Sequence, residues 1–158
     1  MDLSDPAIAD LLTGASHVDT KTVQSDATLR EFVASMLSYR PSWLKALFAM
    51  RGALAWILRL EHEAPERATL RPEDVSFTPG ERATIFVVRG GEEDRFWVGE
   101  AADHHLVAQL CVLRDGATFR VVTIVRYLDW TGPIYFNLIR PFHHLVVGQM
   151  AKAGASAG

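Results

Sequence analysis

The chain has few of the residues that mark several common classes of protein. Cys111 is the only cysteine in 158 residues, so an intrachain disulfide framework is excluded. Because Cys111 lies in an apolar, strand-like stretch, we expect it to be a buried hydrophobic residue rather than a nucleophile. There is no run of lysines or arginines, and the net charge is −3. These two features argue against a nucleic-acid-binding surface.

Long apolar runs are also missing. The longest apolar stretch, residues 43–60, contains Lys45, Arg51 and Arg59 and is too interrupted to cross a bilayer. The first residues carry no basic segment followed by an apolar one, so we expect no secretory signal. The sequence therefore predicts a protein that does not insert into a membrane and that resides in the cytoplasm.

The common cofactor and catalytic motifs are absent as well. Gly90-Gly91 lacks the spacing of a dinucleotide-binding loop and stands between two expected strands. The chain has no G-x-S-x-G elbow, no H-E-x-x-H pair and no C-x-x-C pair. Two histidines and an aspartate could ligate a metal, but adjacent histidines rarely reach one ion and no spacing fixes a third ligand. We therefore expect neither a cofactor nor a metal.

What the chain does contain is a composition typical of a folded protein. Hydrophobic residues make up 49% and charged residues 22%, enough apolar surface for one full-sized core. We expect residues 1–158 to form a single domain. Within it we expect an N-terminal segment at 1–14, a long connection or lid at 61–80, and a fraying tail at 155–158.

Hydrophobic periodicity predicts an alternation of strands and helices. Residues 16–23 alternate as a strand does, and Thr28 with Glu31 has the spacing of a capping box before a helical stripe. Pro41 suits the first turn of a second helix, and a turn is expected at residues 90–93. Short turns join the strands that follow and predict antiparallel pairing. These strands are expected at residues 83–89, 95–101, 105–113 and 118–128.

The C-terminal stretch, residues 130–154, predicts one long amphipathic helix. Its apolar residues recur at steps of three and four on both sides of Pro141, which indicates a kink rather than a break. Thr131 is the expected N-cap and Gly154 the expected stop. The order of elements predicts an α+β fold in which a curved antiparallel sheet grips this helix, with two helices inserted after the first strand. A concave space between sheet and helix would suit a small ligand.

Histidines supply the candidate polar groups of this space. Four of the six form adjacent pairs, at residues 104–105 and 143–144, and one from each pair could meet across the cavity. Histidine serves as a general acid or base near neutral pH. The candidate catalytic residues are His143, His105 and Asp103. The candidate ligand-binding residues are Arg51, His105, Tyr127, Tyr135, Phe142 and His143.

A structural role for these residues is the alternative. One histidine could bond a backbone group and fix helix to sheet while the others are solvated, and we favour this interpretation. Arg51, which interrupts an apolar helix, either pairs with a carboxylate such as Glu100 or Asp103 or waits for an anionic ligand.

Several segments resemble one bacterial family, called domain of unknown function 2867. They are spread along most of the chain and are residues 18–21, 41–44, 50–51, 103–106, 123–125, 132–136 and 139–143. The resemblance implies a helix-grip fold similar to the START and Bet v 1 (SRPBCC) superfamily, although fewer strands are expected here than the seven of the full grip. Members of that superfamily enclose an apolar cavity and bind lipids, steroids or polyketides, and some are cyclases or dehydratases. The family has no settled activity, so the resemblance carries over no catalytic residue. The positions that match its recurring elements are Asp103, His105, Tyr135, Pro141, Phe142 and His143.

Three functions remain open from the sequence. The first is a protein that holds a hydrophobic small molecule, with polar contacts from His105, Tyr135 and His143. The second is an enzyme of the cyclase or isomerase type, with His143 or Asp103 as general base. The third is a non-catalytic interaction domain, whose partner would include a second copy of the chain in a homodimer. Its partner surface would be formed by Val122, Ile124 and Trp97.

Overall fold

The computed structural model describes residues 6–42 and 69–158. It is α+β, with a curved six-stranded antiparallel sheet in the order β1-β6-β5-β4-β3-β2. The strands are β1 (His17–Gln24), β2 (Arg82–Ala83), β3 (Phe86–Glu92), β4 (Phe96–Ala102), β5 (Leu106–Asp115) and β6 (Thr118–Tyr127). The helices are α1 (Pro6–Leu12), α2 (Leu29–Ser38), a 3₁₀ turn η1 (Pro72–Asp74) and α4 (Thr131–Ala155).

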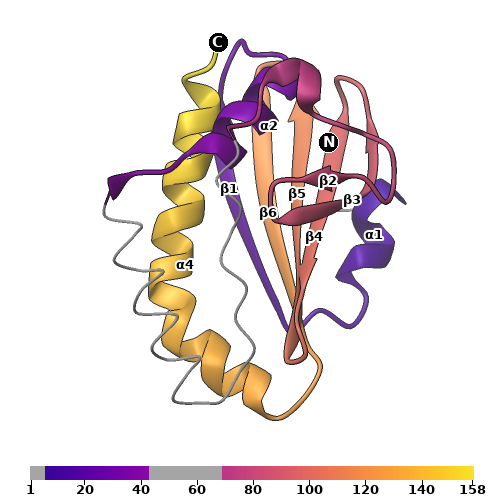
Figure 1. Ribbon diagram of the computed structural model, residues 1–158, viewed down its shortest axis with the longest axis vertical. Coiled ribbons are helices and arrows are strands. Elements are labelled where there is room, and N and C mark those ends of the chain that lie inside the picture. Colours follow the sequence, from indigo (N-terminus) through magenta and orange to yellow (C-terminus); the bar gives the residue numbers. More distant parts are fainter. Residues whose placement is uncertain (1–5, 43–68) are drawn as a thin grey trace.

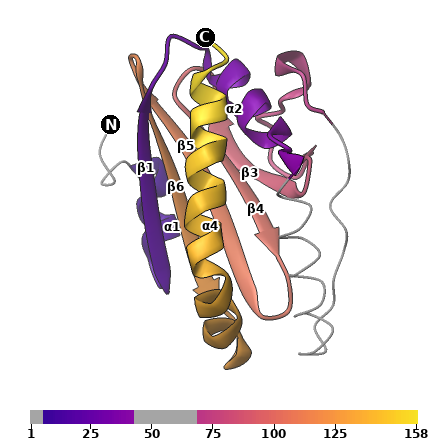
Figure 2. The same ribbon diagram turned by 90° about the vertical axis from the view of Figure 1, so that its left-hand side faces the viewer.

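The helices lie on both faces of the sheet. Figure 1 shows α4 running along one side of the sheet and α1 on the other, and Figure 2 looks onto α4 with the sheet behind it. We call the face toward α2 and α4 the inner face, and the face toward α1 the outer face. The predicted fold, a curved antiparallel sheet that grips a long C-terminal helix, is confirmed. The expected helix that begins at Pro41, the second of the two predicted after the first strand, lies outside the described residues apart from Pro41 and Ser42.

The inner face carries a large part of the core. Phe32 of α2 stacks on Phe119 of β6, with ring centroids 4.1 Å apart and an angle of 3° between the planes. Trp97 of β4 is fully buried on the same side, and its indole N–H donates a hydrogen bond to the backbone oxygen of Ser76. Burial of aromatic groups of this size dominates core energetics.

Part of the outer face is apolar, and α1 covers this part. Ile8 of α1 packs in one cluster with Val98, Cys111, Val122 and Ile124. Successive residues of β6 point to opposite faces, so Val122 and Ile124 belong to this cluster whereas Phe119 and Val121 belong to the inner core.

The partner surface predicted from Val122, Ile124 and Trp97 is wrong. Their exposed fractions are 0%, 1% and 0%. The physical reason is that α1 and its neighbours cover the first two, whereas Trp97 points to the inner face. Association into a homodimer stays a prediction, without these residues as its surface.

Helix α2 begins as its sequence predicts. The Thr28 backbone N–H donates to the Glu31 carboxylate at 2.8 Å, and the Glu31 N–H donates to the Thr28 hydroxyl at 3.3 Å, which completes the capping box. The helix ends at Ser38, where Tyr39 takes an extended conformation ahead of Pro41. Of the connection expected at 61–80, residues 69–80 are described and contain η1.

The strand expected at 83–89 is broken by a turn. Thr84 has a φ of 58°, which ends the two-residue β2, and β3 starts only at Phe86. Gly90 and Gly91 lie inside β3 rather than in the predicted turn, which instead follows β3 at residues 93–95. The reason is packing, because a side chain at Gly91 would meet the Phe77 ring at 2.5 Å.

Helix α4 runs without interruption through Pro141, and Figure 1 shows its first turns bending away from the rest. Its predicted boundaries need two corrections. Thr131 is the first helical residue rather than the cap, and the capping oxygen belongs to the Asp129 carboxylate, which accepts from the N–H groups of Thr131 at 2.9 Å and Gly132 at 3.1 Å. Gly154 does not stop the helix, which continues to Ala155. None of the helices in the described ranges is long and apolar enough to cross a membrane.

Candidate functional site

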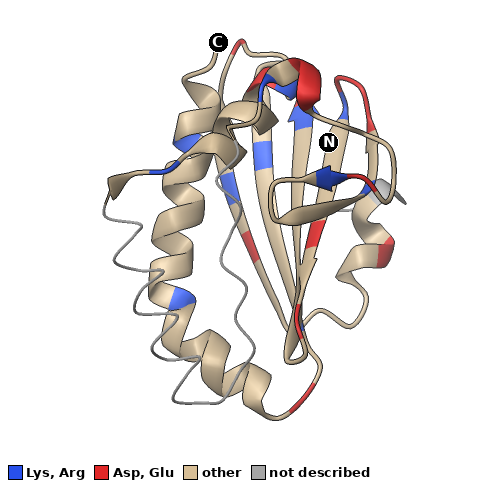
Figure 3. Cartoon of the chain, in the orientation of Figure 1, with Lys and Arg blue, Asp and Glu red and all other residues tan. Residues whose placement is uncertain are grey.

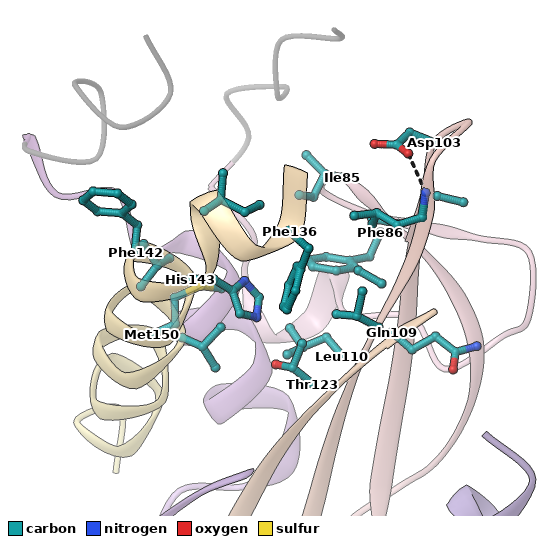
Figure 4. Close-up of a pocket in the computed structure, with 18 of the residues that line it drawn as sticks. Ile85, Phe86, Asp103, Gln109, Leu110, Thr123, Phe136, Phe142, His143 and Met150 are labelled. Carbon is teal, nitrogen blue, oxygen red and sulfur yellow. Dashed lines mark hydrogen bonds between the residues drawn. The ribbon is translucent and has the colours of Figure 1, made fainter. Parts of the chain in front are cut away.

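A pocket of about 460 Å³ lies between α4 and the inner face of the sheet (Figure 4). This volume is within the range of small-molecule sites. Most of its lining is apolar and includes Leu110, Val125, Phe136, Ile139, Val147 and Met150. Helix α4 forms one wall and carries only Arg140 and Lys152 as charged residues, which leaves it almost uniformly tan in Figure 3.

Small residues on two central strands leave room for this pocket. Ala101 of β4 and Ala108 of β5 are paired on the inner face, and both line the pocket. Farther along β4 the space is filled, because Trp97 lies over Gly99 so closely that no side chain fits there. Along the inner face of β4, Trp97 therefore fills the core at one end of the strand, and Ala101 leaves room for the pocket at the other end.

Two polar atoms in the pocket wall are buried without a partner. Neither Thr123 Oγ1 nor His143 Nε2 finds a hydrogen-bond partner among the described residues. Thr123 is only 2% exposed. A buried polar group left unpaired typically costs about 1–3 kcal/mol, so such groups call for a water or a ligand to satisfy them.

The imidazole of His143 is held in its neutral form. Burial lowers its pKa to about 4, and the nearby charge of His144 acts in the same direction. At neutral pH its Nε2 is therefore a donor or an acceptor according to tautomer, and carries no charge. The ring packs edge-on against Phe136, with centroids 5.8 Å apart.

A polar cluster lies beside His143 on β1. The Asp19 carboxylate forms an ion pair with Lys21 at 3.1 Å and lies 3.2 Å from Nδ1 of His144. Burial raises the pKa of Asp19, but hydrogen bonds from Lys21 and His144 outweigh it, so the net effect is a lowered pKa. His17 stands next to Asp19, 5.5 Å from the His144 ring, and burial together with the charge of His144 lowers its pKa. This cluster therefore keeps an ionised carboxylate close to the imidazoles of His17 and His143, whose pKa values are both lowered.

His105 fixes the start of α4 to the sheet. Its Nδ1 lies 2.9 Å from the Asp129 carboxylate and 2.7 Å from the Thr131 hydroxyl, and its backbone oxygen accepts from Leu128. Hydrogen bonds from Thr131 and His105 lower the pKa of Asp129 to about 2. His105 is not among the described residues that line the pocket. Its contacts correspond to the structural role considered as the alternative.

Asp103 lies on the rim of the pocket. One oxygen of its carboxylate accepts from the backbone N–H groups of His105 at 2.8 Å and Leu106 at 2.9 Å, and Figure 4 draws one of these bonds. These bonds hold the turn between β4 and β5 and engage one of the two carboxylate oxygens.

The remaining candidates are divided between the pocket and other places. Tyr135, which is 3% exposed, and Phe142, which is 39% exposed, both line the pocket. Tyr127 packs on Phe136 at a centroid distance of 5.9 Å but is not part of the described lining. Arg51 lies outside the described residues.

Sequence reasoning missed Thr123, His17 and Asp19 as members of the site. The available signal was the unusual polarity of one face of β1, where His17, Asp19 and Lys21 alternate with outward residues. A polar inner face of a strand indicates polar partners on the helix above it. Thr123 gave no comparable signal, because threonine is common in strands.

Cys111 is buried, which confirms its expected role, and burial raises the pKa of its thiol to about 12. A thiol in that state is a poor nucleophile. Within residues 6–42 and 69–158, no three His, Cys, Asp or Glu side chains are placed to hold a metal ion.

Comparisons with known proteins give one match. No curated protein and no solved structure matches the chain. Kinship with the START and Bet v 1 superfamily therefore stays a prediction. The model of a family described as protein of unknown function (DUF2867) matches residues 11–150. The match covers α4 almost to its end and every strand of the sheet, and the chain therefore belongs to this family.

Proposed function

We propose that this protein binds a hydrophobic small molecule, of lipid, steroid or polyketide type, in the pocket between α4 and the inner face. The observation that carries the proposal is an apolar pocket of about 460 Å³ whose wall holds two buried polar atoms without partners among the described residues. An apolar ligand with a polar group would fill the space and satisfy those atoms.

Water is a poor occupant of such a pocket. A buried water needs two to four polar partners, and the described lining offers few in its interior beyond Thr123 and His143. An apolar molecule would instead remove the lining from water, which stabilises the complex by roughly 25 cal/mol for each Å² buried. The balance of solvation therefore supports an organic ligand.

Catalysis by a cyclase or isomerase is the alternative, and the electrostatics support it less. A general base works best when its pKa is near the operating pH. Burial lowers the pKa of His143 to about 4, so its imidazole is a weak base at pH 7. One oxygen of the Asp103 carboxylate accepts from two backbone N–H groups, and this serves the turn between β4 and β5. A hydrogen-bonding role for His143 suits these properties better.

Binding can be tested with the neutral fluorescent dye Nile red and a variant that fills the pocket. Ala108→Phe places a ring in the space above β5, whereas Ala117→Phe adds the same ring at an exposed turn. We expect saturable binding to the wild type and to Ala117→Phe. We expect Ala108→Phe to weaken binding about 10-fold or more, which corresponds to at least 1.4 kcal/mol.

The variants must remain folded, which circular dichroism and thermal melting establish. If Ala108→Phe does not fold, Ala101→Leu fills the neighbouring position on β4. Equal binding of the dye to both Ala108→Phe and the wild type would contradict the proposal, because the dye would then occupy another surface. Absence of saturable binding to the wild type would contradict it as well.

A further inference from the structure

Thr123 and His143 face the same part of the pocket from opposite walls. Thr123 lies on the inner face of β6 and pairs in the ladder with Asp19 of β1. His143 lies on α4, close enough to Asp19, His17 and Lys21 for their charges to act on its pKa. The imidazole therefore lies above the rung that holds Thr123, and Figure 4 shows both side chains at the pocket wall.

Both atoms need a hydrogen-bonding partner, and their chemistry restricts what it can be. A threonine hydroxyl donates and accepts, whereas a neutral imidazole Nε2 does one or the other according to tautomer. A ligand hydroxyl also donates and accepts, so it satisfies both atoms for either tautomer. A carbonyl only accepts, and it would require both protein groups to donate.

The surrounding charges disfavour an ionised ligand group at this point. A carboxylate would lie near Asp19 and would face a neutral imidazole. Of the nearby cations, Lys21 is bound to Asp19 and Arg140 is exposed, and neither belongs to the described lining. A buried charge without a partner is strongly unfavourable. A cationic amine would be repelled by Lys21 and Arg140, and the Asp19 carboxylate, already paired with Lys21, would offset this repulsion only in part.

From this geometry we infer that the ligand carries an uncharged hydroxyl or phenol group that binds between Thr123 Oγ1 and His143 Nε2. Its apolar body extends from there along α4 and the inner face of β5. The inference rests on the proposed function and names the chemical class of the ligand at that same site. A carboxylate would be admitted only at the rim, where Arg40 lies.

Three probes with one skeleton separate these possibilities, namely naphthalene, 2-naphthol and 2-naphthoate. We expect calorimetry at pH 7 to give an affinity for 2-naphthol about 10-fold above that for either of the others, as two neutral hydrogen bonds would provide. The comparison holds the apolar contribution constant, so the difference reports the polar group.

Removal of the Thr123 hydroxyl tests its position. Thr123→Val keeps the shape of the side chain, and we expect it to lower the affinity for 2-naphthol about 3- to 10-fold while leaving naphthalene unchanged. Unliganded Thr123→Val should melt no lower than the wild type, because it loses an unpaired polar atom. Thr20→Val makes the same change on the exposed outer side of β1 and should alter neither property.

Thr123→Ser keeps the hydroxyl group, so we expect this variant to bind 2-naphthol more tightly than naphthalene, as the wild type does. This variant also keeps the test decisive if Thr123→Val does not fold. Tightest binding of 2-naphthoate, or equal losses for all three probes in Thr123→Val, would overturn the inference. Naphthalene and 2-naphthol binding with equal affinity would overturn it too, and would leave the proposed function standing. Failure of all three probes together with Nile red would overturn both.

Discussion

Burial of His143 links the stability of the protein to pH. The pKa of this imidazole is about 4 in the folded protein, against an ordinary value of 6.5. Between these values the unfolded chain binds a proton that the folded protein does not. The contribution of His143 to the free energy of unfolding is therefore fully present above pH 6.5 and is lost as the pH falls toward 4. The total effect is at most about 3 kcal/mol.

Replacement of His143 by phenylalanine should remove this part of the pH dependence. Urea unfolding at pH 7.5 and pH 5 is expected to show a loss of stability on acidification that is smaller in His143→Phe than in the wild type, by about 1–2 kcal/mol. Thr20→Val, which changes an exposed residue that does not titrate, should lose as much stability on acidification as the wild type. Identical losses in His143→Phe and the wild type would show that His143 is not held neutral by burial.

The sequence identified His143 but could not separate it from His105. Both belong to adjacent pairs, and each pair offers one residue to the cavity on geometric grounds. The outcome for His105 depends on Asp129 and Thr131, whose side chains reach it only because the chain turns back at the start of α4. Such contacts arise from tertiary structure and leave no periodic pattern in the sequence.

At the scale of elements, α4 packs on α2 through a glycine. A Cβ at Gly154 would lie 3.0 Å from three atoms of the Phe32 ring, whereas one at Gly148 would meet nothing within 4 Å. This close approach explains why Gly154 lies within the helix instead of ending it. A glycine near the end of a helical pattern can indicate either role, and local sequence does not distinguish them.

Alanine substitutions at these two glycines form a matched pair. Gly148→Ala should raise the free energy of unfolding by about 0.5–1 kcal/mol, because alanine is the better helix former. Gly154→Ala gains the same propensity but crowds Phe32, and overpacking costs about 1–3 kcal/mol, so we expect it to fall below the wild type. Chemical unfolding measures both, and a gain in Gly154→Ala equal to that in Gly148→Ala would contradict the packing described for α2 and α4.

Turns were predicted less well than helices and strands. The capping box of α2 and the helical period of α4 depend on neighbouring residues, and the structure has both as expected. Gly90 and Gly91 suggested a turn, yet they lie in β3 because Gly91 packs against Phe77 from a distant segment. Asp94, with a φ of 59°, contributes to the turn instead.

For the whole molecule, element order was enough to predict the fold class. Short turns require β3 to β6 to be antiparallel neighbours, and a long final helix must bury its apolar face on the sheet. Nothing local indicates that β1 pairs with β6, or that α1 covers the outer face. Those placements depend on long-range packing. Because α1 covers the outer face, it buries Val122 and Ile124, two residues of the predicted partner surface.

The most direct test of ligand binding in the pocket is a methyl NMR titration of the full chain with 2-naphthol. The strands provide internal controls, because neighbouring residues of β5 and β6 point to opposite faces. We predict that saturable shifts concentrate on the methyl groups of Leu110, Val125 and Val147, which line the pocket. The methyl groups of Leu113, Val122 and Ile124 in the outer layer should change little. Shifts centred on the outer layer, or no saturable shift at all, would contradict a ligand held between α4 and the sheet.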